Sequence, residues 1–504
     1  MAISSSSFNG ENDKLGLGFR RVQISDSSHQ DLLLLLLWKL GIRALRRFSF
    51  PASPLPGCRN SDHWMINSSF TTIEGDGIFT ECNEMEITHE EQENSDPTNF
   101  IVEGENTVTK ELKPHTKKAL LEFRCKVEDA ILGNYIFGRS HVSIYKEEGS
   151  KERENFTEIS IWGIPLLPSK AHEGTDVILL KFLKARDFKV SEAFEMLQKT
   201  LIWRKEFKTD GILEENLGSD LENVVYMNST DKKGHPLCYN IYGAFKDKEL
   251  YQKTFGTEEK REEFLRWRIQ FMEKGIKKLS FKDGGVNSMV QITDLKNSPG
   301  PAMKELGAAS KKAVLLLQDN YPEFVLRNIF INVPFWYYAC HLLFSRILTQ
   351  RTKSKFIFAR PSRVAETLLK FIAPEHIPVQ YGGLKREKDD EFSPANKASE
   401  LIVKGGDIES IQIPVTEPGV TMVWDVTVVG WDVSYKEEFI PDDEGSYKIL
   451  IEKEKKMGET VRNSFYISEP GKVLLTIDNG TFKKKKVLYR FKTKPTVPMY
   501  IFLK

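Results

Sequence analysis

Residues 318–383 read QDNYPEFVLRNIFINVPFWYYACHLLFSRILTQRTKSKFIFARPSRVAETLLKFIAPEHIPVQYGG. Two short apolar runs in this stretch, 329–333 and 356–358, are typical of strands buried on both faces. Between them, residues 335–348 are apolar almost all the way round a helix, unlike a surface helix. A basic, hydroxylic segment, 350–355, follows. The residues alone leave two interpretations open: an ordinary buried helix with Lys355 on the surface, or an apolar wall beside a cation that meets a lipid phosphate.

Length and composition narrow the class of protein. A chain of 504 residues predicts two or three domains, and a net charge of +1 selects no partner. Five scattered cysteines without a CxxC pair predict neither a disulfide framework nor a zinc site, and they favour a reducing, cytoplasmic setting. The apolar run around residues 32–40 is too short to span a membrane, which needs about 20 residues.

The order of the predicted elements indicates a multidomain protein. Residues 1–70 are rich in serine and 74–111 are acidic, which predicts a disordered acidic N-terminal tail. A helix over 116–132, capped by Thr116, precedes two helices in 176–207, the second capped by Ser191. Strands and helices then alternate as far as residue 383, as in an α/β fold with parallel strands. The predicted elements are strands 224–227, 237–242 and 288–293, and helices 258–279 and 303–319.

The C-terminal part has a different pattern. After a charged linker, in which Asp389 and Asp390 are interpreted as solvated, short strands recur at regular spacing with turn residues between them. This pattern predicts an all-β sandwich. The predicted strands are 408–415, 419–433, 445–452, 461–467, 471–478 and 485–492.

Several motifs resemble known families. Tyr321-Pro322-Glu323, Asn332-Val333-Pro334, TKSKF at 352–356 and PVQYGG at 378–383 resemble the CRAL-TRIO lipid-binding family. LLKFLKARDFKVSEAFEML at 179–197 resembles the helical lobe that precedes that domain. TMVWDVTVVGWDVSYKEEF at 421–439 and FYISEPGKVLLTIDN at 465–479 resemble the GOLD domain. The combination, behind an acidic tail, resembles the patellins, which are plant phosphoinositide-binding trafficking proteins.

The resemblance implies four regions and a headgroup site. The regions are a disordered acidic tail (1–113), a helical region with the CRAL-TRIO N-terminal lobe (114–212), the CRAL-TRIO domain (213–388) and a GOLD sandwich (389–504). Lys355, Thr352 and Glu323 match the family's phosphatidylinositol site, and Arg186 is a further candidate; the family often has a second basic residue where this chain has Asp187. Gln291 and Met289 stand where the yeast relative contacts choline with small polar residues, so a phosphoinositide is favoured over phosphatidylcholine.

Two further sets of residues are candidates for membrane contact. The apolar helix 335–348 is interpreted as a mobile gate over the cavity, with gate residues Trp336, Tyr337, Leu342, Leu343 and Phe344. A run of lysines in a predicted hairpin is either a contact to anionic lipid or a solubilising strand edge. The run consists of Lys483, Lys484, Lys485 and Lys486.

Three functions follow from these observations. The favoured one is a protein that binds phosphoinositides in a gated pocket and presents or transfers them at membranes, in trafficking such as cell-plate formation during cell division. The alternative is an adaptor whose GOLD domain and acidic tail recruit trafficking proteins around a structural lipid. An enzyme is disfavoured because no GxSxG, GxxxxGK[ST], GxGxxG or HExxH motif occurs. We expect a peripheral protein at the plasma membrane or cell plate, with a phospholipid ligand but no metal, cofactor or nucleic acid.

Overall fold

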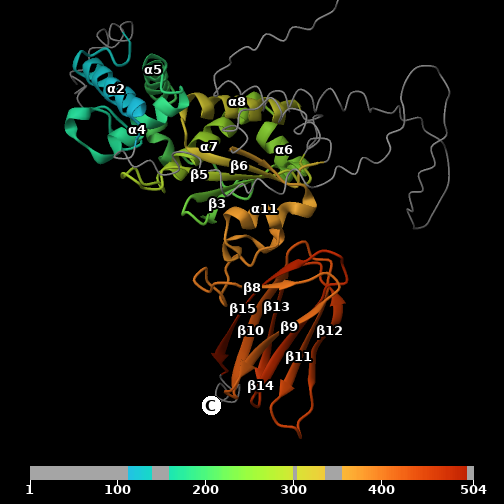
Figure 1. The fold of residues 1–504 in the computed structure, drawn as a ribbon. Helices are drawn as coiled ribbons and strands as arrows, with labels where there is room; N and C mark the ends of the chain where they lie inside the picture. The colour runs from blue at the N-terminus through green and yellow to red at the C-terminus, as the bar shows by residue number, and fades with distance from the viewer. Residues whose placement is uncertain (1–111, 139–157, 299–303, 335–354, 497–504) are drawn as a thin grey trace, which may run out of the picture.

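The computed structural model describes residues 112–138, 158–298, 304–334 and 355–496. Within these ranges the chain forms a helical lobe, an α/β domain and an all-β sandwich, in that order along the sequence (Figure 1). The predicted multidomain architecture is therefore confirmed. The predicted acidic tail lies outside the described residues, and the predicted domain boundaries stay predictions.

The helical lobe packs three helices around one apolar core. The helices are α2 (Pro114–Leu132), α4 (Glu173–Ala185) and α5 (Val190–Glu206), with the short strands β1 (Ser160–Ile161) and β2 (Ile164–Pro165) alongside. Phe123 and Phe182 are fully buried in this core. The predicted caps are wrong. Pro114 already begins α2, because proline suits a first helical turn, so Thr116 is buried inside the helix. Likewise α5 begins one residue before Ser191.

The α/β domain is built on one five-stranded sheet with the order β3-β4-β5-β6-β7. The β3–β4 pair is antiparallel, and β5, β6 and β7 continue parallel to β4. The strands are β3 (Val225–Thr230), β4 (Pro236–Ile241), β5 (Met289–Asp294), β6 (Val325–Ile331) and β7 (Phe356–Phe358). The parallel sheet predicted from the alternating pattern is thus confirmed.

Helices cover both faces of this sheet. One face packs on α6 (Lys248–Phe255), α7 (Glu258–Ile276) and α8 (Lys304–Asn320). The other face packs on α11 (Val364–Phe371) and on Tyr381 (Figure 1). Among the described residues, no helix is both long and apolar enough to cross a membrane.

The sandwich consists of two antiparallel four-stranded sheets, β13-β10-β15-β8 and β12-β11-β14-β9. Their strands are β8 (Ser399–Val403), β9 (Ile408–Val415), β10 (Val420–Val428), β11 (Ser434–Pro441), β12 (Ile449–Lys456), β13 (Val461–Ile467), β14 (Gly471–Asp478) and β15 (Lys485–Pro495). The prediction missed β8 and β11, and it extended β10 past its end at Val428 as far as residue 433. The sequence pattern of β11 is hard to recognise because a charged residue, Glu437, occupies a core position in it. Glu437 accepts hydrogen bonds from Trp424 Nε1 (2.9 Å) and the Tyr435 hydroxyl (2.7 Å).

The segment that joins the α/β domain to the sandwich is packed against the sandwich. Thr460 donates a hydrogen bond to the Gly383 carbonyl (3.0 Å), and Arg490 donates to the Leu384 carbonyl (2.8 Å). The side chain of Asp389 is only 8% exposed here, and it receives two hydrogen bonds from Arg462, at 2.6 and 2.8 Å. The interpretation of Asp389 as solvated is therefore wrong, because two sandwich arginines surround it.

Candidate functional site

An ion pair in the α/β domain joins two of the predicted headgroup residues. Lys355 lies directly before β7 and is 9% exposed. Its Nζ lies 2.9 Å from Oε1 and 3.0 Å from Oε2 of Glu323, in the turn between α8 and β6. The two residues are 32 positions apart in sequence, so the parallel neighbours β6 and β7 bring them together.

The turn that carries Glu323 is held from several sides. The Tyr321 hydroxyl donates to Glu273 Oε1 (2.6 Å), which Arg204 also contacts (2.5 Å). Glu323 itself has a left-handed backbone with φ of +54°. This conformation is uncommon for a residue other than glycine and is characteristic of functional turns. The carboxylate is therefore presented to Lys355 by a fixed backbone.

A second buried lysine lies behind this turn. The Nζ of Lys181, on α4, donates to the Glu323 carbonyl at 2.9 Å and lies 4.5 Å from the centre of the Phe324 ring. Burial lowers the pKa of Lys181 to about 7, although the Glu323 carboxylate acts in the opposite direction. The burial of Lys181 could not be recognised from the sequence, because in α4 this lysine occupies a position that fits an ordinary amphipathic helix pattern.

Lys355 and Glu323 form part of the wall of a cavity of about 280 Å³. The cavity lies between the sheet, α7 and α8, and the end of α4. Its apolar lining includes Met272, Val314, Leu317, Val325, Phe330 and Phe356. Its polar lining includes Arg186, Asn240, Tyr242, Arg268, Gln291, Thr293 and Asn328. An apolar space with a few convergent polar groups is the usual form of a ligand site.

Arg186 reaches the same cavity from the helical lobe. It follows α4, and its Nη1 donates to the Ala185 carbonyl (3.0 Å). The next two residues, Asp187 and Phe188, both have positive φ (49° and 61°), which turns the chain sharply into α5. Arg186, Lys355 and Glu323 thus lie on one cavity. Thr352 and the predicted gate residues, Trp336, Tyr337, Leu342, Leu343 and Phe344, lie outside the described residues.

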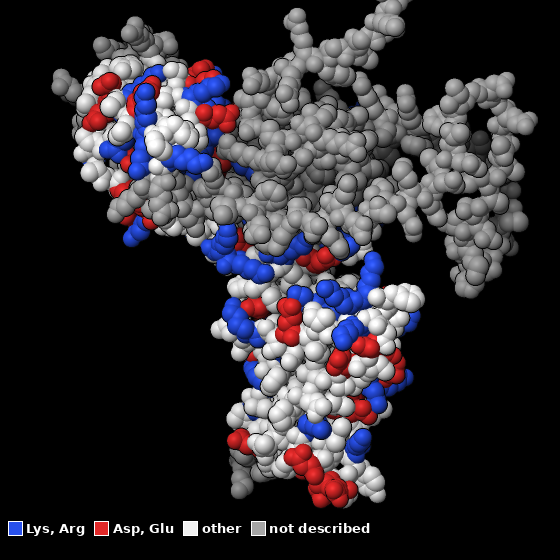
Figure 2. All heavy atoms as spheres, viewed as in Figure 1, with Lys and Arg blue, Asp and Glu red and all other residues white. Residues whose placement is uncertain are grey.

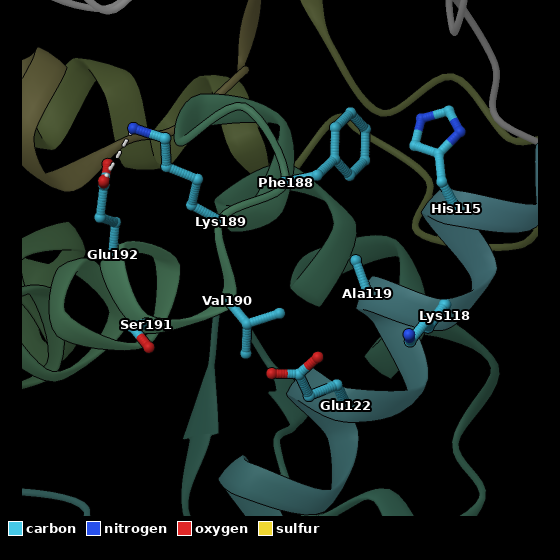
Figure 3. A pocket seen from close by; sticks show the side chains of 9 residues that line it. All are labelled: His115, Lys118, Ala119, Glu122, Phe188, Lys189, Val190, Ser191 and Glu192. Atoms are coloured by element: carbon cyan, nitrogen blue, oxygen red, sulfur yellow. Dashed lines mark hydrogen bonds and ion pairs between the residues drawn. The ribbon is translucent and has the colours of Figure 1, made fainter.

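A second hollow lies on the helical lobe, between α2 and the start of α5 (Figure 3). It measures about 470 Å³ and is open to solvent. The Lys189 ammonium pairs with Glu192 (2.9 Å), and the His115 ring lies edge-on to Phe188. In Figure 3 the polar side chains of this hollow point in different directions, so they do not converge on one ligand atom.

Comparison with known proteins places the chain in a family. Residues 140–199 match the CRAL/TRIO N-terminal domain, 222–383 the CRAL/TRIO domain, and 404–485 the patellin-1-like C-terminal GOLD domain. Patellin-3 of Arabidopsis thaliana is 47% identical over 426 residues, which cover 83% of this chain and 83% of that protein. The chain belongs to the patellin family.

Two other relatives show how far the likeness extends. Patellin-4 of Arabidopsis thaliana is 58% identical over 340 residues, covering 67% of this chain. This patellin chain spans only 62% of the length of Patellin-4. The phosphatidylinositol transfer protein SFH5 of Kluyveromyces lactis is 29% identical over 254 residues, which are 48% of this chain and 80% of that protein.

The predicted lysine run of this patellin lies apart from the cavity, at the turn between β14 and β15. Lys485 donates to the Trp431 carbonyl (2.9 Å), and Lys486 pairs with Glu400 (2.5 Å). Lys483 and Lys484 are exposed, and Phe482 beside them is fully exposed. In the view of Figure 2, Lys and Arg side chains gather at the end of the sandwich nearest the α/β domain.

Proposed function

We propose that this protein binds a phosphoinositide, with the inositol phosphate at Lys355 and the acyl chains against the apolar cavity wall. The observation that carries the proposal is the buried Lys355–Glu323 ion pair in that wall. A buried ammonium requires an anionic partner, since an unpaired buried charge is costly. A phosphate can take over that role with charge-assisted hydrogen bonds, while the inositol hydroxyls donate to the Glu323 carboxylate.

Three further observations support this ligand. Arg186 lines the same cavity and adds a second cation for a multiply charged headgroup. Thr352 is proposed to add a hydroxyl beside Lys355, on the basis of its place in the motif. SFH5, a relative, is named as a phosphatidylinositol transfer protein.

The protein is proposed to present or transfer this lipid at membranes rather than to catalyse a reaction. Trp336 and Phe344 are proposed as part of a gate, since an aromatic side chain that leaves protein for bilayer keeps about 1.5–3 kcal/mol of burial. The exposed hairpin residues Phe482, Lys483 and Lys484 are proposed to contact anionic lipid. The setting is peripheral association in membrane trafficking, with the plasma membrane or cell plate as the proposed location and the sandwich as a surface for protein partners.

Replacement of Lys355 tests the headgroup site. Lys355→Ala should lower phosphoinositide affinity by about 1.5–3 kcal/mol, roughly ten- to a hundredfold, because it removes a charge-assisted hydrogen bond. Binding to vesicles with and without phosphoinositide measures the loss, and Lys260→Ala, a partly exposed lysine on α7 that does not line the cavity, is the matched control. The site is wrong if Lys355→Ala loses neutral phospholipid and phosphoinositide to the same extent.

The gate has its own test. Trp336→Asp combined with Phe344→Asp should leave thermal unfolding unchanged but stop lipid exchange between vesicles, because each new carboxylate resists transfer into the bilayer. Normal exchange by a folded double variant would contradict the gate.

A further inference from the structure

One buried arginine of the cavity has no acidic partner among the described residues. Arg268, on α7, is 6% exposed, and its Nη1 donates to the Oδ1 atom of Asn240 at 3.2 Å. The Asn240 amide is neutral, so it accepts a hydrogen bond without balancing the charge. Buried cations are normally paired with anions. The equally buried Arg204 follows that rule, since it pairs with Glu273 and Asp210.

The register of the sheet shows where this arginine lies relative to the headgroup pair. Asn240 on β4 is opposite Thr293 on β5, and Thr293 is opposite Phe330 on β6. Lys355 directly precedes β7, the neighbour of β6 on its far side. Three strand spacings of about 4.8 Å therefore separate the Asn240 and Lys355 ends of the cavity, or about 14 Å.

The two ends also differ in chemistry. At the β7 end, Lys355 is already neutralised by Glu323. At the β4 end, neutral polar side chains of β4, of the turn after it and of β5 line the same cavity as Arg268. These are the side chains of Asn240, Tyr242, Gln291 and Thr293. Arg268 is thus a buried positive charge of the cavity that no carboxylate balances among the described residues, at the end away from the Glu323 turn.

We propose that Arg268 and Asn240 form a second anion-binding site that takes the phosphate of an anionic phospholipid with no cationic headgroup, such as phosphatidic acid. This inference rests on the proposed function, because the apolar part of the ligand occupies the same cavity. One phosphate cannot reach both ends, so the second site receives a different lipid class from the one at Lys355. A planar guanidinium binds phosphate through two parallel hydrogen bonds and repels a choline ammonium.

The surroundings favour a lipid phosphate over a free one. Met272 on α7 and Val325 and Phe330 on β6 line the same cavity. These side chains offer no hydrogen bond to a small anion but cover acyl chains. A free phosphate shares the chemistry of the Arg268 contact, and it is therefore a separate arm of the test.

Lipid uptake by the full-length protein tests the proposal. The protein is incubated with phosphatidylcholine vesicles that contain either phosphatidic acid or a phosphoinositide, re-isolated, and analysed for bound lipid by mass spectrometry. Arg268→Gln should lower phosphatidic acid uptake roughly ten- to a hundredfold, the effect of one lost charged hydrogen bond. The same variant should retain phosphoinositide uptake. Lys355→Ala should show the reverse pattern. Lys260→Gln, on the same helix as Arg268 but outside the cavity lining, should change neither.

Further arms separate the possible outcomes. Arg268→Lys keeps the charge but cannot form the two parallel hydrogen bonds of a guanidinium, so it should recover part of the phosphatidic acid uptake. The same variant replaces Arg268→Gln if Arg268→Gln does not fold. Equal phosphatidic acid uptake by wild type and a folded Arg268 variant overturns the inference. Stabilisation of wild type alone by inorganic phosphate, with phosphatidic acid uptake unchanged, also overturns it and assigns the site to a free anion. A wild-type protein that takes up phosphoinositide but no phosphatidic acid refutes the inference alone, whereas one that takes up no lipid refutes the proposed function.

Discussion

At the scale of single residues, Glu323 is the most constrained group of the candidate site. Its backbone carbonyl accepts from Lys181, its carboxylate binds Lys355, and its φ is positive. The two lysines therefore hold one glutamate, Lys181 through its backbone carbonyl and Lys355 through its carboxylate.

The pKa of Lys181 leads to a prediction about pH. An unfolded lysine keeps its proton up to about pH 10.4, whereas burial lowers the pKa of Lys181 in the folded protein to about 7. Between these values the unfolded chain binds one more proton, so the unfolding free energy rises with pH, by at most about 1.4 kcal/mol per unit. Relative to Lys181→Met, wild type should gain stability from pH 7 to 10 in urea titrations. A stability difference between wild type and Lys181→Met that does not change with pH would contradict the lowered pKa. Such a constant difference is expected for Lys199→Met, which changes an exposed lysine.

The sequence could predict some of these residues but not their contacts. Glu323 and Lys355 could be predicted from the sequence because they lie in motifs that resemble a known site. Lys181 and Arg268 lie within ordinary helical patterns, where a basic residue normally faces solvent. Only the tertiary structure, which places α4 beside the Glu323 turn and α7 against the sheet, shows that both cations are buried.

At the scale of elements, the β14–β15 hairpin is held by one asparagine. Asn479 is fully buried, and its Nδ2 donates to the carbonyls of Lys404 (2.8 Å) and Lys483 (2.8 Å). This anchor fixes the backbone on which Lys483 and Lys484 project. The sequence predicted the strands on either side of this hairpin correctly because they alternate regularly, whereas the inward Glu437 concealed β11.

The four lysines of the β14–β15 hairpin are expected to contribute unequally to membrane binding. Lys483→Ala with Lys484→Ala should weaken binding to anionic vesicles by about 2 kcal/mol, roughly thirtyfold, at low ionic strength. Lys485→Ala with Lys486→Ala should have a smaller effect, because those side chains already contact Trp431 and Glu400. Vesicle co-sedimentation at increasing salt measures both pairs. Equal losses from the two double variants would contradict the division into pairs, and no loss from either would leave the run as a solubilising edge.

At the scale of the whole molecule, the α/β domain and the sandwich are joined by a short, buried charge network. Asp389, in the connecting segment, binds Arg462, and both Arg462 and Arg490 bind the fully buried Asp425. Lys397 adds an ion pair to Glu375 of the α/β domain (2.8 Å). The sequence showed a charged linker, but the arginine partners of Asp389 lie more than 70 positions away and could not be predicted from local pattern.

This network predicts how the junction responds to acid. Burial opposes ionisation of Asp389, but hydrogen bonds from Arg462 and from the backbone of Phe392 and Glu391 lower its pKa to about 2. Its stabilisation is therefore complete above the ordinary aspartate pKa near 4 and is lost as pH falls towards 2. Asp389→Asn should lose about 1.5–3 kcal/mol at pH 7 in urea unfolding and expose the linker to protease.

The neighbouring residue provides the control for this junction. Asp390→Asn, one position further on, changes the same charge at an exposed site and should behave as wild type. If the stability difference between Asp389→Asn and wild type persisted unchanged at pH 2, Asp389 would not be the group that titrates.

The ion pair at Lys355 has a consequence for selectivity in a cell, where small phosphates are abundant. Glu323 is a competitor covalently attached to the protein, and such tethered groups act at an effective concentration of millimolar or more. A free phosphate that displaces it from Lys355 offers the Glu323 carboxylate no hydroxyl in exchange. An inositol phosphate would also bring hydroxyl groups, which can donate to the Glu323 carboxylate in place of the Lys355 ammonium. If the proposed headgroup site is right, Glu323 therefore favours ligands that carry both an acid and an alcohol.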